Sequence, residues 1–201
     1  GSTRVADYRR SLVERMAQTM LNERLAEVAR RPDAAFLGAG VGSESITPGV
    51  EAFSVSVRVQ DGKVGEGLAA AALEARRARE FGFGAAELDR TKKNLMAAYE
   101  RVYAERDKSE SGAFAQELLS LFLEDEPAPG IAYEYALVKN VVPSISLDEI
   151  SDAMRRMMTE EGRVVLVTAP QKQGLIPPSE QTLKDALASA DAAPVTARLD
   201  I

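Results

Sequence analysis

The sequence has 201 residues, 45% of them hydrophobic, which suits one core-forming domain with a small appendage. Its net charge of -6, from 25 basic and 31 acidic residues, argues against a nucleic-acid partner because phosphate contacts need a basic surface. The chain has no histidine and no cysteine, which excludes Ser-His-Asp triads, Cys-His pairs, disulfides and nearly all zinc sites within it.

The N-terminal part of the chain predicts one long helix. The chain opens with Gly1-Ser2 and no methionine, as a cloning remnant does, so we assign residues 1–4 to a lead-in. Residues 5–31 form an amphipathic pattern that Pro32 closes, because the residue before a proline is disfavoured in the α conformation. The apolar positions at helical spacing are Leu12, Met16, Met20, Leu25 and Val28.

Two strand segments follow this helix. Residues 34–47 are small and glycine-rich, and they predict a strand or an irregular arm of a hairpin. Pro48-Gly49 predicts a turn. Residues 53–59 alternate strictly between apolar and polar side chains, which predicts a strand with one buried and one exposed face. The apolar row consists of Phe53, Val55, Val57 and Val59.

The middle of the chain predicts three helices. Residues 63–81 form an alanine-rich helix whose small side chains allow close packing against a sheet, and residues 82–84 break it. Helices over 85–107 and 111–123 follow, and the acidic and proline-rich run 124–129 ends the last one. The apolar positions are Leu68, Ala72, Leu73 and Ala75 in the first helix; Leu88, Leu95, Tyr99 and Val102 in the second; and Phe114, Leu118, Leu119 and Phe122 in the third.

The C-terminal part predicts three helices and a buried strand. A short helix covers residues 133–139, and the capping box from Ser146 to Glu149 starts another that runs to about residue 160. Residues 163–169 are continuously apolar, which predicts a strand buried on both faces. Ser179 caps a final helix to about residue 190.

These elements predict an α+β fold: a two-layer domain in which a mainly antiparallel sheet is backed by several helices on one face. About three strands for six or seven helices leave the sheet incomplete, as if a first strand before Val5 were missing. We assign residues 5–170 to this domain and residues 171–201 to a linker, a C-terminal helix and a tail.

Candidate sites for ligands or catalysis are weak. Gly38, Gly40 and Gly42 invite a phosphate-loop interpretation, but the third glycine comes one residue early for G-x-G-x-x-G and no helix follows, so a closely packed strand is favoured. Glu44 with Glu51 could supply paired carboxylates. The run Glu124-Asp125-Glu126 could do so too, but its place before two prolines is typical of a solvated turn.

The remaining candidates have ordinary structural interpretations. Arg90, Lys92 and Lys93 form a basic helix face that is typical of a solvated surface. Tyr99, Tyr103 and Arg106 lie at helix-packing positions, and Ser109 and Ser111 lack an activating partner in the sequence. We assign no catalytic residue and no metal ligand, and the substrate-binding residues are unknown.

Four motifs in order carry a family resemblance. Residues 8–14 (YRRSLVE), running into residues 20–25 (MLNERL), resemble the first helix of the second homologous domain in pitrilysin/insulinase-family peptidases. Residues 81–90 (FGFGAAELDR) resemble the family's GF-x-x-x-EL-x-R junction between two helices. Residues 142–150 (VPSISLDEI) are similar to a family helix entry, and residues 163–170 (RVVLVTAP) to its closing strand. The likeness is nearest to the long bacterial members, which have four such domains in one chain.

The resemblance implies a mitochondrial-processing-peptidase-like metallohydrolase domain that pairs with a homologous zinc-bearing domain of the same parent chain around a peptide substrate. The family's zinc lies in the first domain, on an inverted His-x-x-Glu-His helix plus a downstream glutamate. This chain contains no histidine and therefore none of that motif. The Arg/Tyr pair with which the family's last domain grips substrate is not matched either. A bacterial periplasmic or cell-envelope location follows by analogy.

Three functional hypotheses follow. The leading one is an accessory domain of a zinc-dependent endopeptidase, inactive alone, that supports the zinc domain and walls the peptide chamber. The second is a scaffold or interaction domain from a non-catalytic family member, which a degenerate zinc motif in the parent protein would favour. The third is a stand-alone enzyme that uses carboxylates or lysine, which predicts hydrolysis without metal.

Overall fold

A computed structural model describes residues 2–47, 50–105, 131–159 and 173–198 of this chain. The chain divides into two compact units, one of residues 1–85 with 147–201 and one of residues 86–146. Several expectations lie outside the described residues: the turn at Pro48-Gly49, the helix over 111–123, the acidic run 124–126 and the strand over 163–169. Those four expectations stay predictions.

The first unit is built on helix α1, Ser2–Ala29. All five apolar positions predicted for this helix are buried, from Leu25, which is fully buried, to Val28, which is 9% exposed. The buried side also includes Val13, Ala17 and Leu21, so the helix presents a stripe wider than the sequence pattern alone indicates. The helix ends at Ala29, two residues before the predicted end, and turns precede Pro32.

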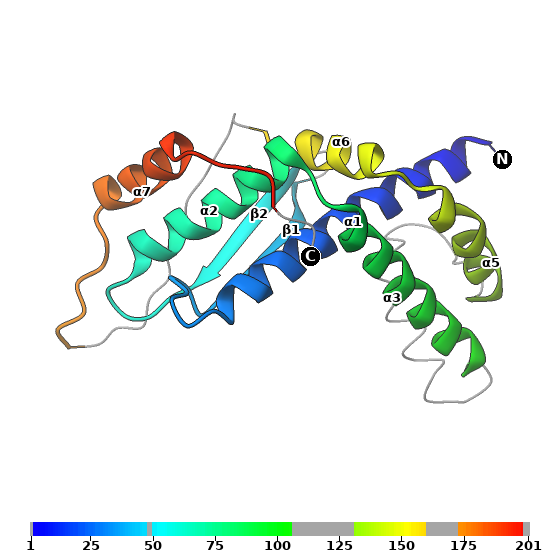
Figure 1. The fold of residues 1–201 in the computed structure, drawn as a ribbon, viewed down its shortest axis with the longest axis horizontal. Helices are drawn as coiled ribbons and strands as arrows, with labels where there is room; N and C mark the ends of the chain where they lie inside the picture. Colours follow the sequence, from blue (N-terminus) through cyan, green and yellow to red (C-terminus); the bar gives the residue numbers. More distant parts are fainter. Residues whose placement is uncertain (1, 48–49, 106–130, 160–172, 199–201) are drawn as a thin grey trace. The chain divides into compact units, whose positions relative to one another are not determined.

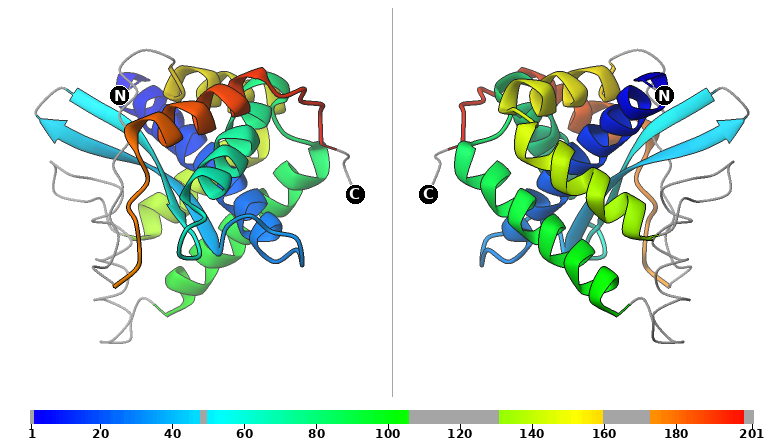
Figure 2. Two further views of the ribbon diagram at one scale, coloured as in Figure 1. Left: turned by 90° about the vertical axis from the view of Figure 1, so that its left-hand side faces the viewer. Right: turned by 90° about the vertical axis from the view of Figure 1, so that its right-hand side faces the viewer.

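A β-hairpin follows α1, made of strands β1, Gly38–Thr47, and β2, Val50–Arg58. The two strands pair antiparallel and form a two-stranded sheet in the described part of the chain. Strand β1 packs beside α1, and β2 packs beside helix α2, Val64–Phe81. Figure 2 shows both helices on the same side of the hairpin.

The predicted apolar row of β2 is buried unevenly. Val59, just past the end of the strand, lies against the backbone of α2 at Gly67, whereas Val55 is 38% exposed. The alternating pattern correctly predicted a strand, but the expected continuous buried face is not present. Phe53, Val57 and Val59 are all partly buried, so Val55 is the exposed member of the row.

Helix α2 buries small side chains rather than its leucines. Its buried positions include Gly67, Ala71, Ala75 and Ala78, whereas Leu68 and Leu73 are only partly buried. Helix α6, Leu147–Met157, packs against both α1 and α2, and helix α7, Glu180–Ala192, packs against α2. Close approach of a neighbouring element is easiest where the facing side chains are small, which accounts for the buried glycine and alanine residues of α2.

The C-terminal helix α7 is held at both ends by hydrogen bonds. The Ser179 hydroxyl accepts a hydrogen bond from the backbone N–H of Thr182, which confirms the predicted cap. Nη1 of Arg76, on α2, donates to the carbonyl oxygens of Ala190 and Ala193 at 2.9 and 2.7 Å, which satisfies carbonyl groups at the C-terminal end of α7. Beyond the helix, Arg198 bonds to Glu27 of α1. The segment that follows the predicted linker is therefore anchored to the first unit.

The second unit contains helix α3, Ala85–Ala104, helix α5, Ile131–Val141, and the short 3-10 helix η1, Val142–Ser144. The rings of Tyr103 and Tyr135 stack with their centroids 4.8 Å apart. Among the described residues of this unit, the buried apolar side chains are Leu88, Tyr99, Val102, Val138, Val141, Val142 and Ile145.

The described elements confirm the α+β class, with many helices and an antiparallel sheet. The layering of the whole domain, the completeness of its sheet and the boundary at residue 170 stay predictions. Within the described residues, no helix is both long enough and apolar enough to cross a membrane.

Candidate functional site

Three of the motifs that carry the family resemblance meet in the first unit, and the contact begins at Gly82. This glycine ends α2 with φ 66° and ψ -143°, and its N–H donates to the carbonyl oxygen of Ala78. A Cβ atom at this position would lie 2.2 Å from Oγ of Ser151, on α6. Only glycine combines this backbone conformation with so close an approach.

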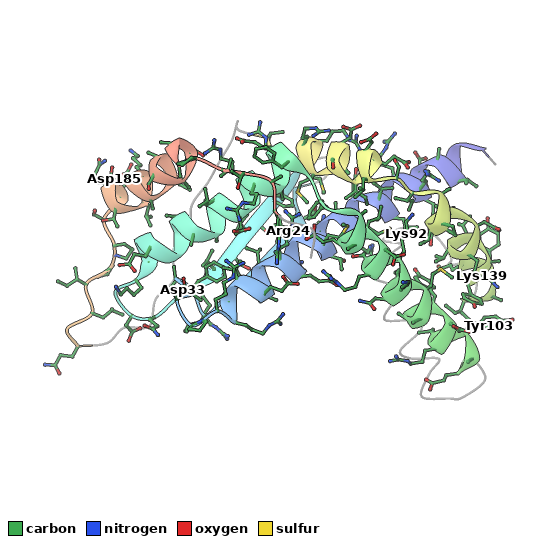
Figure 3. All side chains as sticks on the ribbon, viewed as in Figure 1. Arg24, Asp33, Lys92, Tyr103, Lys139 and Asp185 are labelled. Atoms are coloured by element: carbon green, nitrogen blue, oxygen red, sulfur yellow. The ribbon has the colours of Figure 1, made fainter. Side chains whose placement is uncertain are left out.

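Phe83 follows and packs beneath Arg24 of α1. The Arg24 guanidinium carbon lies 4.5 Å from the centroid of the Phe83 ring, in a cation–π arrangement. Figure 3 labels Arg24 on α1. Both side chains are buried, with exposed fractions of 2% for Arg24 and 8% for Phe83. The GF pair of the junction motif therefore joins α2 and α6 through its glycine and α1 through its phenylalanine.

Two amide side chains of α1 contact strand β1. Asn22 Nδ2 donates to the carbonyl oxygen of Val41 at 3.0 Å, and Asn22 Oδ1 accepts from the Val41 N–H at 2.6 Å. One helical turn earlier, Gln18 Nε2 donates to Ser43 Oγ at 2.7 Å and to Met157 Sδ at 3.4 Å. Neither amide stands out in the sequence, because nothing in the helical pattern shows which polar residue faces the sheet.

An ion pair joins the motif at residues 8–14 to the motif at residues 142–150. Arg9 on α1 donates from Nε and from Nη2 to the two carboxylate oxygens of Glu149 on α6, at 2.8 and 2.9 Å. These hydrogen bonds, together with the carboxylate charge, raise the pKa of Arg9 above its ordinary value. Because a raised arginine pKa stabilises the folded state, this contribution is complete below the ordinary pKa of arginine and is lost as the pH rises through the raised value, and it requires that the Glu149 carboxylate is ionised.

The Arg9–Glu149 pair makes a measurable prediction. We expect a double-mutant cycle with Arg9→Ala and Glu149→Ala to give a coupling energy of about 1 kcal/mol. Two parallel charge-assisted hydrogen bonds stabilise the pair, but partial exposure to solvent weakens their contribution. The side chains are 31% and 37% exposed. Urea denaturation of the four proteins measures the coupling.

The matched control for this cycle is the pair of Lys184 and Glu180 on α7, whose side chains are 67% and 80% exposed. We expect a coupling energy of no more than about 0.5 kcal/mol there, as for other exposed pairs one helical turn apart. Equal coupling energies in the two pairs would contradict a stabilising role for the bridge between α1 and α6.

The structure does not support a phosphate-binding loop at the glycine-rich segment or a cross-strand pair of glutamates. Gly38, Gly40 and Gly42 lie in strand β1, as favoured, and not in a phosphate-binding loop. In the hairpin register Glu44 is opposite Ala52 and Glu51 is opposite Ser45, so the two glutamates are not cross-strand partners. Their side chains, and residues 106, 109, 111 and 124–126, lie outside the described part of the chain.

The other candidates lie on the second unit and have structural roles. Lys92 donates to the carbonyl oxygen of Pro143, and exposed Lys93 pairs with Asp89. Tyr99 is buried, and Tyr103 stacks on Tyr135. This agrees with their interpretation as solvated charge and helix packing.

The donor set does not fit a zinc site. Zinc in proteins is held mainly by histidine nitrogen and cysteine sulfur, and the chain has neither residue. Among the residues that the structure describes, no three carboxylates gather where they could hold a metal ion.

Comparison with known proteins finds similarity to proteases in sequence and in fold. No family model matches the chain. A curated relative from Arabidopsis thaliana, described as a zinc protease PQQL-like, is 29% identical over 172 residues, covering 86% of this chain and 15% of the relative.

Solved structures of two proteases contain a segment with the same fold as this chain. The periplasmic protease PqqL from Escherichia coli matches 94% of this chain and 21% of its own chain, with a TM-score of 0.71 and 14% identity. A predicted insulinase family protease from Yersinia pestis matches 94% of this chain and 40% of its own, with a TM-score of 0.72 and 13% identity.

These matches show that the chain shares its fold with segments of solved proteases, one of which is described as of the insulinase family. The structure of the first half of PqqL also matches, over 98% of this chain and 42% of that structure. This chain spans less than half the length of each of these matches, from 15% to 42%, and the fold it shares with the solved structures is that of a segment of a longer chain.

Proposed function

We propose that this chain is an accessory, non-catalytic domain of a zinc-dependent endopeptidase. The observation that carries the proposal is the donor set: a domain related to a zinc protease has no histidine or cysteine with which to bind zinc. In this proposal the zinc ion is bound by a homologous domain of the same parent chain. The match to the first half of PqqL supports a neighbouring domain in the same polypeptide.

The packing of the first unit suits a supporting role. Helix α1 is held to the hairpin by Asn22, to α6 by Arg9 and to the junction after α2 by Arg24. Side chains fixed in this way keep a surface in one shape, which a chamber wall requires in order to hold a peptide and exclude water. We place the parent protein in the bacterial periplasm or cell envelope, supported by the periplasmic description of PqqL.

The isolated 201-residue chain tests this proposal. We expect no cleavage of an unstructured fluorogenic peptide, with added zinc or with a chelator, and no stoichiometric zinc binding in a calorimetric titration. Cleavage in the presence of chelator would favour the third hypothesis, a carboxylate or lysine enzyme. A tight stoichiometric zinc site would contradict the assignment of zinc to another domain.

Experiments on the full-length parent protein distinguish the accessory-domain hypothesis from the scaffold hypothesis. We expect the full-length protein to contain an inverted His-x-x-Glu-His motif and to cleave peptide. Substitutions that destabilise this domain should reduce cleavage while one zinc ion per chain remains bound. A parent protein without that motif and without activity would instead support the scaffold alternative.

A further inference from the structure

Strand β1 has an outer edge, the side that faces away from β2. In an antiparallel pair, residues alternate between positions that exchange both backbone hydrogen bonds with the partner strand and positions whose N–H and C=O point away from it. Val41 is opposite Val55 in the register, yet both of its backbone groups bond to Asn22. Val41 is therefore an outward-pointing position, and its N–H and C=O are the groups that an added strand would use.

The spacing along α1 matches the spacing along β1. Residues 18 and 22 are one helical turn apart, a rise of about 6 Å, and residues 43 and 41 are separated by about 6.6 Å along a strand. Gln18 contacts Ser43 and Asn22 contacts Val41, so the helix and the strand run in opposite directions and stay in step. Figure 1 shows α1 alongside β1. The carboxamide of Asn22 occupies the place that the backbone of a neighbouring strand would take.

Strand β1 is rich in glycine, so its outer edge would pair easily with another strand if it were uncovered. An unprotected edge strand is a template for pairing with another chain, and glycine-rich strands specify their register weakly. Gly38, Gly40 and Gly42 lie along β1, and a side chain at Gly40 would approach Oδ1 of Asn22 to 3.5 Å. The same glycines that let α1 approach closely would make an open edge easy to pair.

We propose that the Asn22 carboxamide closes the outer edge of β1 and so prevents this chain from pairing edge to edge with a second copy of itself. The inference does not depend on the proposed function, because it concerns only α1 and the hairpin. The occupant of an opened edge would be β1 of a second molecule, since identical strands can pair antiparallel across a twofold axis.

The test compares Asn22→Ala with Gln18→Ala in the 201-residue chain. Both remove an amide of α1 that contacts β1, but only Asn22 bonds to the strand backbone. We expect Asn22→Ala to speed amide hydrogen exchange at Val41 by roughly threefold to tenfold, the loss of one ordinary hydrogen bond. Asn22→Ala should also self-associate in sedimentation experiments at rising concentration. Gln18→Ala should behave as the wild type does in both measurements.

A second substitution distinguishes edge pairing from general loss of structure. Ser43→Lys places a charge beside the opened edge, where lysine discourages strand addition, so Asn22→Ala/Ser43→Lys should return to the wild-type sedimentation behaviour. Association that persists in the double variant would overturn the proposal, as would an Asn22→Ala protein that sediments like Gln18→Ala. If Asn22→Ala does not fold by circular dichroism, Asn22→Ser, whose shorter hydroxyl does not span both backbone groups, carries the same expectations.

Discussion

Replacement of Gly82 by alanine is expected to lower the free energy of unfolding by about 3 kcal/mol or more, from a strained backbone conformation and a steric overlap together. The residue has φ 66° and ψ -143°. An added Cβ would lie 2.2 Å from Oγ of Ser151 and 3.1 Å from its Cβ. A new rotamer of Ser151 could move its Oγ away, but the close approach to Ser151 Cβ can be relieved only by a shift of α2 or α6. Chemical denaturation measures the change.

Gly62→Ala is the matched control for this prediction. Gly62 also has a positive φ, 81°, but an added Cβ there would meet nothing within 4 Å. We expect this substitution to cost about 1 kcal/mol, from the backbone conformation alone. Ser151→Gly in the Gly82→Ala background should recover part of the difference. Equal costs at the two glycines would show that the contact with Ser151 is not sterically demanding.

Replacement of Gly67 by alanine should have the next largest effect. An added Cβ would lie 2.1 Å from Cγ1 of Val59 and 3.2 Å from the carbonyl oxygen of Ala35. We expect overpacking to cost about 3 kcal/mol and the better helix propensity of alanine to return about 1 kcal/mol, a net loss of about 2 kcal/mol. Thermal and chemical denaturation should both detect the loss.

Gly65 provides the control on the same helix. An added Cβ there would approach only Cγ2 of the exposed Thr182 side chain, at 3.2 Å. Gly65→Ala should therefore be neutral or stabilise the protein by up to about 1 kcal/mol. Val59→Ala removes the atom that Gly67→Ala would strike, so the double variant should be less destabilised than the sum of the single variants. Additive losses would argue against direct contact between these positions.

Local patterns in the sequence predicted most of the described elements. The apolar spacing from Leu12 to Val28 predicted α1, and the alternation from Phe53 to Val59 predicted β2, because each periodicity reflects a backbone geometry set within a few residues. The same reasoning did not predict which residues of α2 are buried. There Leu68 and Leu73 stay partly exposed while glycine and alanine are buried, because the close approach of neighbouring elements decided the buried side.

The motifs predicted where α2 would end but not what would meet there. Nothing near Gly82 in the sequence indicates Ser151, and nothing near Arg9 indicates Glu149, which is 140 residues away. Asn22 was one polar residue among many on an amphipathic helix. Contacts of this kind depend on how separate elements cross, and a single sequence does not contain that information in its local periodicity.

The sequence by itself determined which chemistry this chain can carry. A chain without histidine and cysteine cannot supply imidazole or thiolate groups as metal ligands or as catalytic groups, whatever its fold. If the proposed function is right, the expected zinc ion must therefore be bound by another domain. Only the tertiary structure decided which side chains meet: Asn22 with the edge of β1, Arg24 with Phe83, and Gly82 with Ser151. The physical reason is that composition limits the available groups, whereas packing between distant elements selects the contacts among them.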